Sequence, residues 1–130
     1  MKKILVTGAG GMLGHAIAKA LIPNVRGAGD HEVVLYTHGD GASRTLDIEN
    51  AAAVKDITQK EFAGWKDSFD AAWIVNCAAY TDVDGAERHH ERAFGVNARG
   101  VENLVRAADE LAVRVLHLSE VVLHTNQLLL

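Results

Sequence analysis

The 130-residue sequence predicts a doubly wound, Rossmann-like α/β domain, in which helices cover both faces of a parallel sheet. Three observations favour this fold class. Short apolar runs alternate with segments of helical periodicity, and the run at residues 71–78 is apolar throughout except for Asn76, as in a strand buried on both faces. A glycine-rich turn stands at the first junction between a strand and a helix. Right-handed crossovers between the five strands give the spatial order 3-2-1-4-5.

The predicted elements follow one another in chain order. The strands are residues 3–7, 32–36, 44–47, 71–78 and 113–118, of which the third is short. The helices are a segment that ends at Pro23, residues 51–57 with Asn50 as N-cap, and residues 84–111 with an interruption near Gly95. The apolar stripe of the last helix is Val101, Leu104, Val105 and Ala108. Since the strand order reverses between the first and fourth strands, a ligand is expected at their carboxyl ends.

Composition narrows the function classes. The net charge of −4 argues against nucleic acid or an anionic membrane as a partner. The single cysteine, Cys77, excludes an internal disulfide and makes a reducing cytoplasm the simplest setting. No metal site is expected, because the adjacent His89 and His90 point apart on a helix and no further ligands complete a set.

The turn after the first strand is the strongest functional signal. Gly8, Gly11 and Gly14 recur at spacings of three between an apolar strand and a helix. Glycines let backbone N–H groups approach phosphates, and the helix that follows presents its positive end to an anion. The candidate pyrophosphate-binding residues are Gly8, Gly10, Gly11, Met12, Leu13 and Gly14. The alternative is a flexible turn of small residues.

The end of the second strand bears on the cofactor. An acidic residue at this place binds the ribose 2′-hydroxyl of NAD, and here Thr37 and His38 stand instead. His38 or Arg44 offers positive charge for an additional phosphate, although Asp40 is close. NADP(H) is therefore favoured and NAD(H) is possible. The alternative is that Thr37 and His38 are ordinary loop residues.

Two later segments carry a family resemblance. The first, N-x-A-A-Y-T-x-V-D-x-A-E, begins at Asn76, and the second, V-N-A-x-G-x-x-N-L, begins at Val96. With the glycine spacing, they make residues 1–119 resemble the dTDP-4-dehydrorhamnose reductase family, a nucleotide-sugar group of the extended short-chain dehydrogenase/reductase superfamily. The resemblance implies an NAD(P)-binding domain over 1–119.

The resemblance also assigns roles to single residues. It implies that Ala78, Ala79 and Tyr80 line the cofactor, where the small alanines let a nicotinamide ribose pass close to the backbone. It places Asp47, beside Ile48, near the adenine, although helix capping is a competing interpretation of Asp47. Asn97 would match the superfamily's structural and catalytic asparagine, or it satisfies backbone groups at a helix kink.

The catalytic set of the superfamily is incomplete in this sequence. Its reductases use a Tyr-x-x-x-Lys pair, but neither Tyr36 nor Tyr80 has a lysine four residues later. Ser119 matches the family, whereas Glu120 stands where a threonine belongs, so Asn97 and Ser119 are possible remnants of the catalytic set. We therefore expect no activity from this chain alone.

Two function classes stay open. The first is the cofactor-binding part of a reductase of dTDP-rhamnose biosynthesis that lacks the C-terminal substrate domain, whether truncated, frame-shifted or a fragment. The second is a genuine stand-alone, non-catalytic NADP-binding regulatory module, similar to a regulatory subunit of methionine adenosyltransferase. The apolar tail at 120–130 and an uncovered edge of the sheet predict a homo-oligomer.

Overall fold

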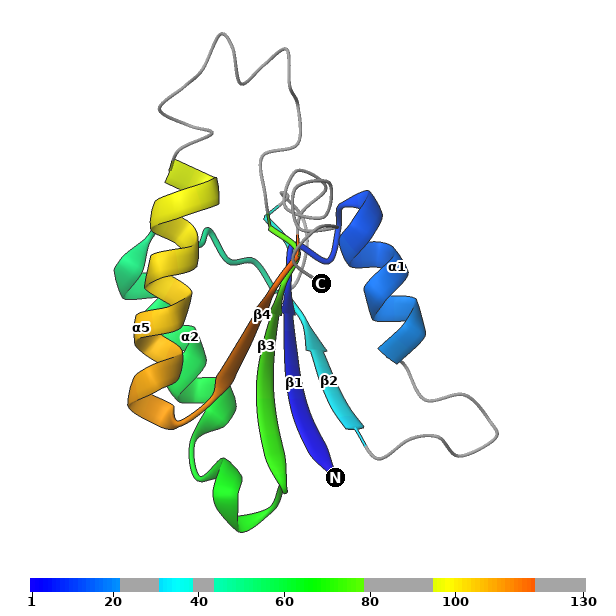
Figure 1. Cartoon of the computed structure of the whole chain (residues 1–130), viewed down its shortest axis with the longest axis vertical. Coiled ribbons are helices and arrows are strands. Elements are labelled where there is room, and N and C mark those ends of the chain that lie inside the picture. The colour runs from blue at the N-terminus through cyan, green and yellow to red at the C-terminus, as the bar shows by residue number, and fades with distance from the viewer. Residues whose placement is uncertain (22–30, 39–43, 79–94, 119–130) are drawn as a thin grey trace, which may run out of the picture.

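Helices cover both faces of a single parallel sheet (Figure 1). The computed structural model describes residues 1–21, 31–38, 44–78 and 95–118. The strands are β1 (Lys2–Thr7), β2 (His31–Leu35), β3 (Ala71–Asn76) and β4 (Arg114–His117). The α-helices are α1 (Met12–Leu21), α2 (Ala51–Phe62) and α5 (Val101–Leu111), with a short 3₁₀ turn, η1 (Trp65–Asp67), and a π-helix, η2 (Gly95–Gly100). Figure 1 shows α1 on one side of the sheet and α2 and α5 on the other.

The sheet order confirms the doubly wound fold class. The strands lie in the order β2-β1-β3-β4, and every pair is parallel. The chain moves outward from β1 to β2 and then returns to the other side of β1 to form β3. The order therefore reverses between β1 and β3, and their carboxyl ends meet at the edge where such folds bind ligands.

The predicted third strand, residues 44–47, is reduced to a single bridge. Thr37 pairs with Thr45 in a parallel bridge, and the Leu46 N–H donates to the Thr37 carbonyl at 2.9 Å. Pairing stops there because the chain turns at once: the Asn50 N–H donates to the Asp47 carbonyl at 3.0 Å, and α2 begins one residue later. The position beside β2 agrees with the predicted order, but the strand does not develop.

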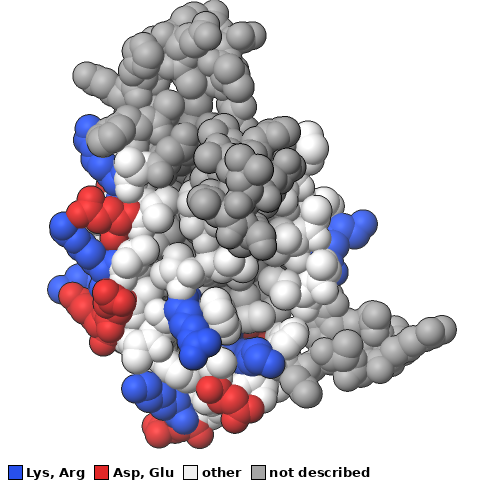
Figure 2. Space-filling model, viewed as in Figure 1, with Lys and Arg blue, Asp and Glu red and all other residues white. Residues whose placement is uncertain are grey.

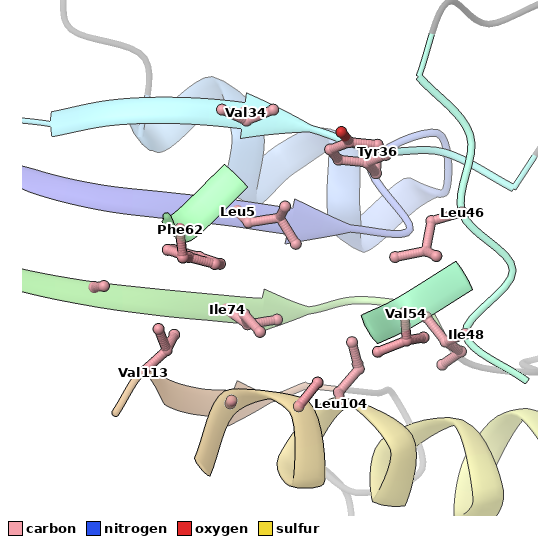
Figure 3. Packing of buried hydrophobic residues seen from close by; sticks show 13 residues of the cluster. Leu5, Val34, Tyr36, Leu46, Ile48, Val54, Phe62, Ile74, Leu104 and Val113 are labelled. Carbon is pink, nitrogen blue, oxygen red and sulfur yellow. The ribbon is translucent and has the colours of Figure 1, made fainter. Parts of the chain in front are cut away.

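Each face of the sheet has its own apolar core. On the α2 and α5 face, Leu5 and Ile74 are fully buried against residues from both helices (Figure 3). In Figure 3, Leu46 and Ile48 reach into the same core from the segment before α2. On the α1 face, Ile4, Val6, Ala9 and Val75 form a smaller cluster. Strand β1 is thus buried on both faces, as its apolar run predicts.

Two helices differ from the sequence prediction. Helix α2 continues to Phe62 rather than ending at residue 57, because Val54, Thr58 and Phe62 keep the four-residue spacing of one buried face. The polar Thr58 hides this periodicity; its hydroxyl donates to the Val54 carbonyl at 2.8 Å and is thereby satisfied inside the helix. In α5, Val105 is 41% exposed, so its assignment to the apolar stripe was wrong.

The predicted Leu104 and Ala108 are buried, and the third buried residue of α5 is Ala107, which the prediction left out. In the described residues, the π-helix η2 begins at Gly95 and leads directly into α5; the segment before Gly95 lies outside the described residues, so the predicted interruption is not tested. Residues 84–94 of that predicted helix, Pro23, and the tail at 120–130 lie outside the described residues. Within the described residues, no helix combines the length and apolar character needed to cross a membrane.

Candidate functional site

The glycine turn connects β1 to α1 at the carboxyl edge of the sheet. Gly8 has a φ of +68°, a left-handed conformation that side chains rarely adopt. The turn is held by the Ala9 N–H, which donates to the Tyr36 carbonyl at 3.0 Å, and by the Gly11 N–H, which donates to the Gly8 carbonyl at 3.2 Å. The turn is therefore anchored to β2 and has a defined shape, which argues against a merely flexible turn.

Two glycines of the turn are required by the fold itself. A Cβ on Gly8 would lie 2.4 Å from the Ala78 backbone nitrogen, so the end of β3 passes directly over this position. A Cβ on Gly14 would lie 1.9 Å from the Gly8 carbonyl oxygen, because α1 packs closely against the turn. Neither position has room for a side chain.

Gly10 and Gly11 are different, because the fold leaves room there. A Cβ on Gly10 would make an ordinary 3.5 Å contact with the Thr37 side chain, and one on Gly11 would lie 3.6 Å from the Gly8 carbonyl oxygen. Both residues are exposed. Packing among the described residues does not explain these two glycines, whereas a ligand lying against their backbone would.

The first turn of α1 suits an anion at this place. The first N–H groups of any helix lack partners within the helix, and its dipole is positive at that end. The first turn of α1 contains no acidic residue, and Met12 is 85% exposed. Backbone donors and a cradle that a Cβ would fill thus fit a pyrophosphate group.

Thr37 and His38 follow β2 and face the same edge. The Thr37 N–H donates to the Arg44 carbonyl at 3.1 Å, while its hydroxyl oxygen is buried without a partner among the described residues. His38 Nε2 lies 4.0 Å from Asp47 Oδ1, and both side chains are more than half exposed. The structure therefore brings Thr37, His38 and Asp47 together beside the glycine turn.

Asp47 does not cap α2. Its side chain accepts a hydrogen bond from the Glu49 N–H at 3.0 Å within the preceding turn. The N-cap is Asn50, as predicted, and its side chain accepts from the Ala53 N–H at 3.1 Å. The capping interpretation of Asp47 is therefore wrong, and among the described residues its second carboxylate oxygen has no hydrogen-bond partner.

Ile48 is a core residue that fixes the segment carrying Asp47. It is 2% exposed, and a Cβ on Gly100 would lie 2.5 Å from its Cδ1. Asn103 Nδ2 donates to the Ile48 carbonyl at 2.9 Å and to the Glu49 carbonyl at 3.2 Å. Gly100 and Asn103 belong to the second sequence motif, so this part of the motif holds the 47–49 segment against α5. Sequence reasoning did not identify this role.

A polar row crosses the sheet directly beneath the candidate site. Thr7, Asn76 and His117 are in register on β1, β3 and β4. The Thr7 hydroxyl donates to Asn76 Oδ1 at 2.5 Å, the Ala78 N–H donates to the same oxygen at 3.1 Å, and Asn76 Nδ2 lies 2.9 Å from His117 Nδ1. Thr7 and Asn76 are fully buried, and burial lowers the pKa of His117 from its ordinary 6.5. The sequence signals this row only by placing a lone Asn in an apolar strand.

Several predicted site residues lie beyond what the structure describes. Ala79, Tyr80 and Ser119 are outside the described residues, and Asn97 is placed by its backbone alone, within η2. Ala78 is described and lies against Gly8. Cys77 is half-buried, and burial raises the pKa of its thiol, as expected for a packed residue rather than a nucleophile.

Charged side chains are concentrated on part of the visible surface. Figure 2 shows Lys, Arg, Asp and Glu over the side formed by α2 and α5 and around the lower end of the sheet. Residues 7–14 contain none of these residue types, so an anion at the turn meets no carboxylate from that segment. In the described ranges, no group of three metal-ligating side chains comes together.

Comparison with known proteins adds an independent finding. The family model described as the RmlD substrate binding domain matches residues 1–123. The chain is 40% identical over 119 residues to a dTDP-4-dehydrorhamnose reductase of Aggregatibacter actinomycetemcomitans, a match that covers 92% of this chain and 35% of that protein.

Solved structures give the same result. A dTDP-4-dehydrorhamnose reductase from Clostridium acetobutylicum matches with a TM-score of 0.68 and 33% identity, covering 87% of this chain and 34% of that one. The enzyme from Bacillus anthracis, solved in complex with NADP, matches with a TM-score of 0.69 and 28% identity, covering 88% and 35%. The chain thus spans about a third of the length of the curated relatives it matches.

Proposed function

The chain belongs to the RmlD substrate binding domain family, and we propose that residues 1–119 are the dinucleotide-binding part of a dTDP-4-dehydrorhamnose reductase. The observation that carries this proposal is that the four glycines of the turn between β1 and α1 differ in whether a side chain would fit. At Gly8 and Gly14 the surrounding backbone leaves no space for a Cβ. At Gly10 and Gly11 a Cβ would fit among the described residues, and these two glycines are exposed near the carboxyl ends of β1 and β3, where the strand order reverses. A pyrophosphate is the ligand that such a cradle serves.

The residues around the cradle have separate tasks in this proposal. The backbone of Gly10, Gly11 and the first turn of α1 holds the pyrophosphate. Asp47 and the Ile48 backbone would meet the adenine, and Ala78 lets the nicotinamide ribose pass close to β3. When bound, the dinucleotide supplies a hydride for reduction of a sugar carbonyl.

NADP(H) is the favoured cofactor, and NAD(H) is possible. Thr37 and His38 put no carboxylate at the end of β2, which leaves a 2′-phosphate unopposed there. The nearby Asp47, 4.0 Å from His38, weakens the preference. The NADP complex of the Bacillus anthracis relative supports it.

Tyr36 is not the proton donor of a reductase. Its hydroxyl donates to Glu61 Oε1 at 2.7 Å, and burial, together with this bond, raises the pKa of Tyr36 to about 12. A tyrosine that transfers a proton near neutral pH needs the opposite shift. Together with the lack of a Tyr-x-x-x-Lys pair in this sequence, the raised pKa of Tyr36 leaves the chain without a tyrosine suited to this role. The missing pair favours the second candidate, a non-catalytic NADP-binding regulatory module, for the chain as it stands, and we expect no turnover of dTDP-4-dehydro-6-deoxy-mannose by the purified chain alone.

The binding proposal is tested by titrating NADPH into the chain in a calorimeter. Gly11→Val should abolish binding, because its branched side chain fills the cradle while the fold has room for the Cβ. Ala20→Val is the matched control, since Ala20 is exposed near the C-terminal end of α1, away from the glycine turn. Equal NADPH affinity in Gly11→Val and the unmodified chain would refute the proposal.

A homo-oligomer through the outer edge of β4 is also proposed, in a cytoplasmic setting. β4 pairs with β3 alone among the described strands, and Leu116 on it is 45% exposed. An uncovered edge is a template for pairing with another chain. Light scattering on the full chain and on a version ending at Ser119 tests this, and a full chain that stays monomeric at high concentration would exclude it.

A further inference from the structure

The polar row beneath the glycine turn has only one consistent arrangement of hydrogen bonds. The Ala78 N–H can only donate, so the Asn76 side-chain atom that faces it is the oxygen. The amide nitrogen of Asn76 therefore faces His117, and an amide nitrogen can only donate. His117 Nδ1 must then accept, which requires a neutral imidazole with its proton on Nε2.

Protonation of His117 would break this arrangement. Imidazolium carries a proton on Nδ1, so two donors would face each other 2.9 Å apart. Rotating the Asn76 amide would restore that contact but would turn the nitrogen toward the Ala78 N–H and the Thr7 hydroxyl. In either case a buried donor loses its acceptor, and Ala78 is the residue whose backbone lies against Gly8.

We propose that His117 is a positioning residue for dinucleotide binding: the neutral imidazole fixes the Asn76 amide, which holds Ala78 in place beside the glycine turn. The inference rests on the proposed function, since it concerns the same site. It predicts that the dinucleotide binds more weakly when His117 takes up a proton. Burial of the ring favours the neutral state at neutral pH, in agreement with this role.

Other ionisable groups near β4 do not occupy the same position. From β3, the neighbouring ionisable side chain is Cys77, which belongs to the cluster on the α1 face. From α5, the residues packed inward are Leu104, Ala107 and Ala108. The charged residues of α5 and η2 in the described region are exposed: Arg99, Glu102, Arg106, Asp109 and Glu110. The facing group identified for His117 is thus the Asn76 amide.

The test measures the affinity for NAD⁺ between about pH 8 and pH 5, in the unmodified chain and in two variants. NAD⁺ is the probe because it lacks the 2′-phosphate, which titrates in this range. The unmodified chain should bind roughly tenfold more weakly at the lower pH. His117→Asn keeps an acceptor in the place of Nδ1 and does not titrate, so it should lose this pH dependence. His117→Leu should bind weakly at both pH values.

The other histidines of the chain are the same in the unmodified chain and in His117→Asn, so the difference between these two proteins isolates His117. His31→Asn is the matched control, since His31 lies at the opposite end of the sheet, and it should keep the full pH dependence. Equal pH dependence in the unmodified chain and His117→Asn would overturn the inference. So would tight binding by His117→Leu at the higher pH.

A second measurement separates this inference from the proposed function. In the cofactor-free chain, the NMR signal and exchange protection of the Ala78 amide should follow the titration of His117, and should be constant with pH in His117→Asn. An Ala78 amide that does not respond while His117 titrates would overturn the positioning role even if NAD⁺ binds. If neither NAD⁺ nor NADPH binds while Ala78 responds, the proposed function is overturned, and with it the role of His117 in binding.

Discussion

The two ends of the sheet satisfy their polar groups in opposite ways. At the amino end, formal charges pair: Lys3 Nζ lies 2.6 Å from Glu32 and 3.7 Å from Glu61, and the amino group of Met1 lies 3.0 Å from Asp70. At the carboxyl end, the buried groups Thr7 and Asn76 are neutral. Among the described residues, the buried ion pair, Lys3 with Glu61, therefore lies at the end away from the candidate site.

This difference has a functional consequence. A buried ion pair beneath the glycine turn would hold a poorly screened carboxylate close to any bound phosphate, whereas the neutral side chains of Thr7 and Asn76 shape this edge without repelling an anion. The Asp47 carboxylate beside the turn is more than half exposed, so water screens its charge. The amino end has no such restriction, and there charges join β1, β2 and α2. The comparison predicts that variants at the amino end change stability alone, while some variants at the carboxyl end change binding alone.

The largest expected effect is at Gly14. Gly14→Ala should lower the free energy of unfolding by more than about 3 kcal/mol, because its Cβ would lie 1.9 Å from a backbone oxygen that cannot move without displacing the turn. Gly10→Ala is the control; its Cβ has an ordinary contact, so stability should change by less than about 1 kcal/mol. Urea unfolding followed by circular dichroism measures both, and equal losses would remove the distinction between structural and ligand-facing glycines.

That distinction marks the limit of what the sequence could predict. The glycine spacing located the turn and the switch point, and both are confirmed by the order of the strands. The sequence could not separate Gly8 and Gly14 from Gly10 and Gly11, because the difference depends on where Ala78 and α1 pass in space. Local pattern identifies a turn, whereas tertiary contacts decide which of its glycines the fold needs.

The row of Thr7, Asn76 and His117 was beyond sequence reasoning for a similar reason. These residues are 69 and 41 positions apart along the chain, and only the register of three strands brings them together. Asn76 was visible as the polar residue in an apolar strand, but its partners were not. The exposed Val105 and the longer α2 were missed because apolar character alone does not specify which helix face meets the sheet.

The next largest effect on stability is expected at the amino end, when the buried Glu61 carboxylate loses its partner Lys3. Lys3→Met should lower the free energy of unfolding by about 2–3 kcal/mol, because Glu61, whose side chain is 12% exposed, loses its cation. The double variant Lys3→Met with Glu61→Gln should recover part of this loss, since no buried charge remains and Tyr36 keeps an acceptor. NADPH affinity should be unchanged in both. A fall in affinity with stability intact would contradict the separation of the two ends.

Tyr36→Phe should have a smaller effect on stability, and this effect should disappear at high pH. Tyr36→Phe removes the bond to Glu61 and should lower the free energy of unfolding by about 1 kcal/mol. The pKa of Tyr36 is raised from 10.0 to about 12 in the folded chain, so its stabilising contribution is complete below pH 10 and is lost as the pH rises through 12. Unfolding measured against pH in both proteins tests this, and the two curves should converge in the alkaline range. Curves that stay parallel would show that Tyr36 does not titrate as described.

The smallest effect is expected at the exposed ion pair of the same amino end. The Met1 amino group and the Asp70 carboxylate are 3.0 Å apart but 56% and 87% exposed, so water screens their attraction and little desolvation accompanies it. Asp70→Asn should change the free energy of unfolding by less than about 0.5 kcal/mol, and added salt should remove even that difference. Lys3→Met serves as the comparison in the same buffers, because its effect depends on burial and should persist in salt. A loss from Asp70→Asn as large as that from Lys3→Met would mean that charge pairing itself, and not the burial of Lys3 and Glu61, stabilises this end of the sheet.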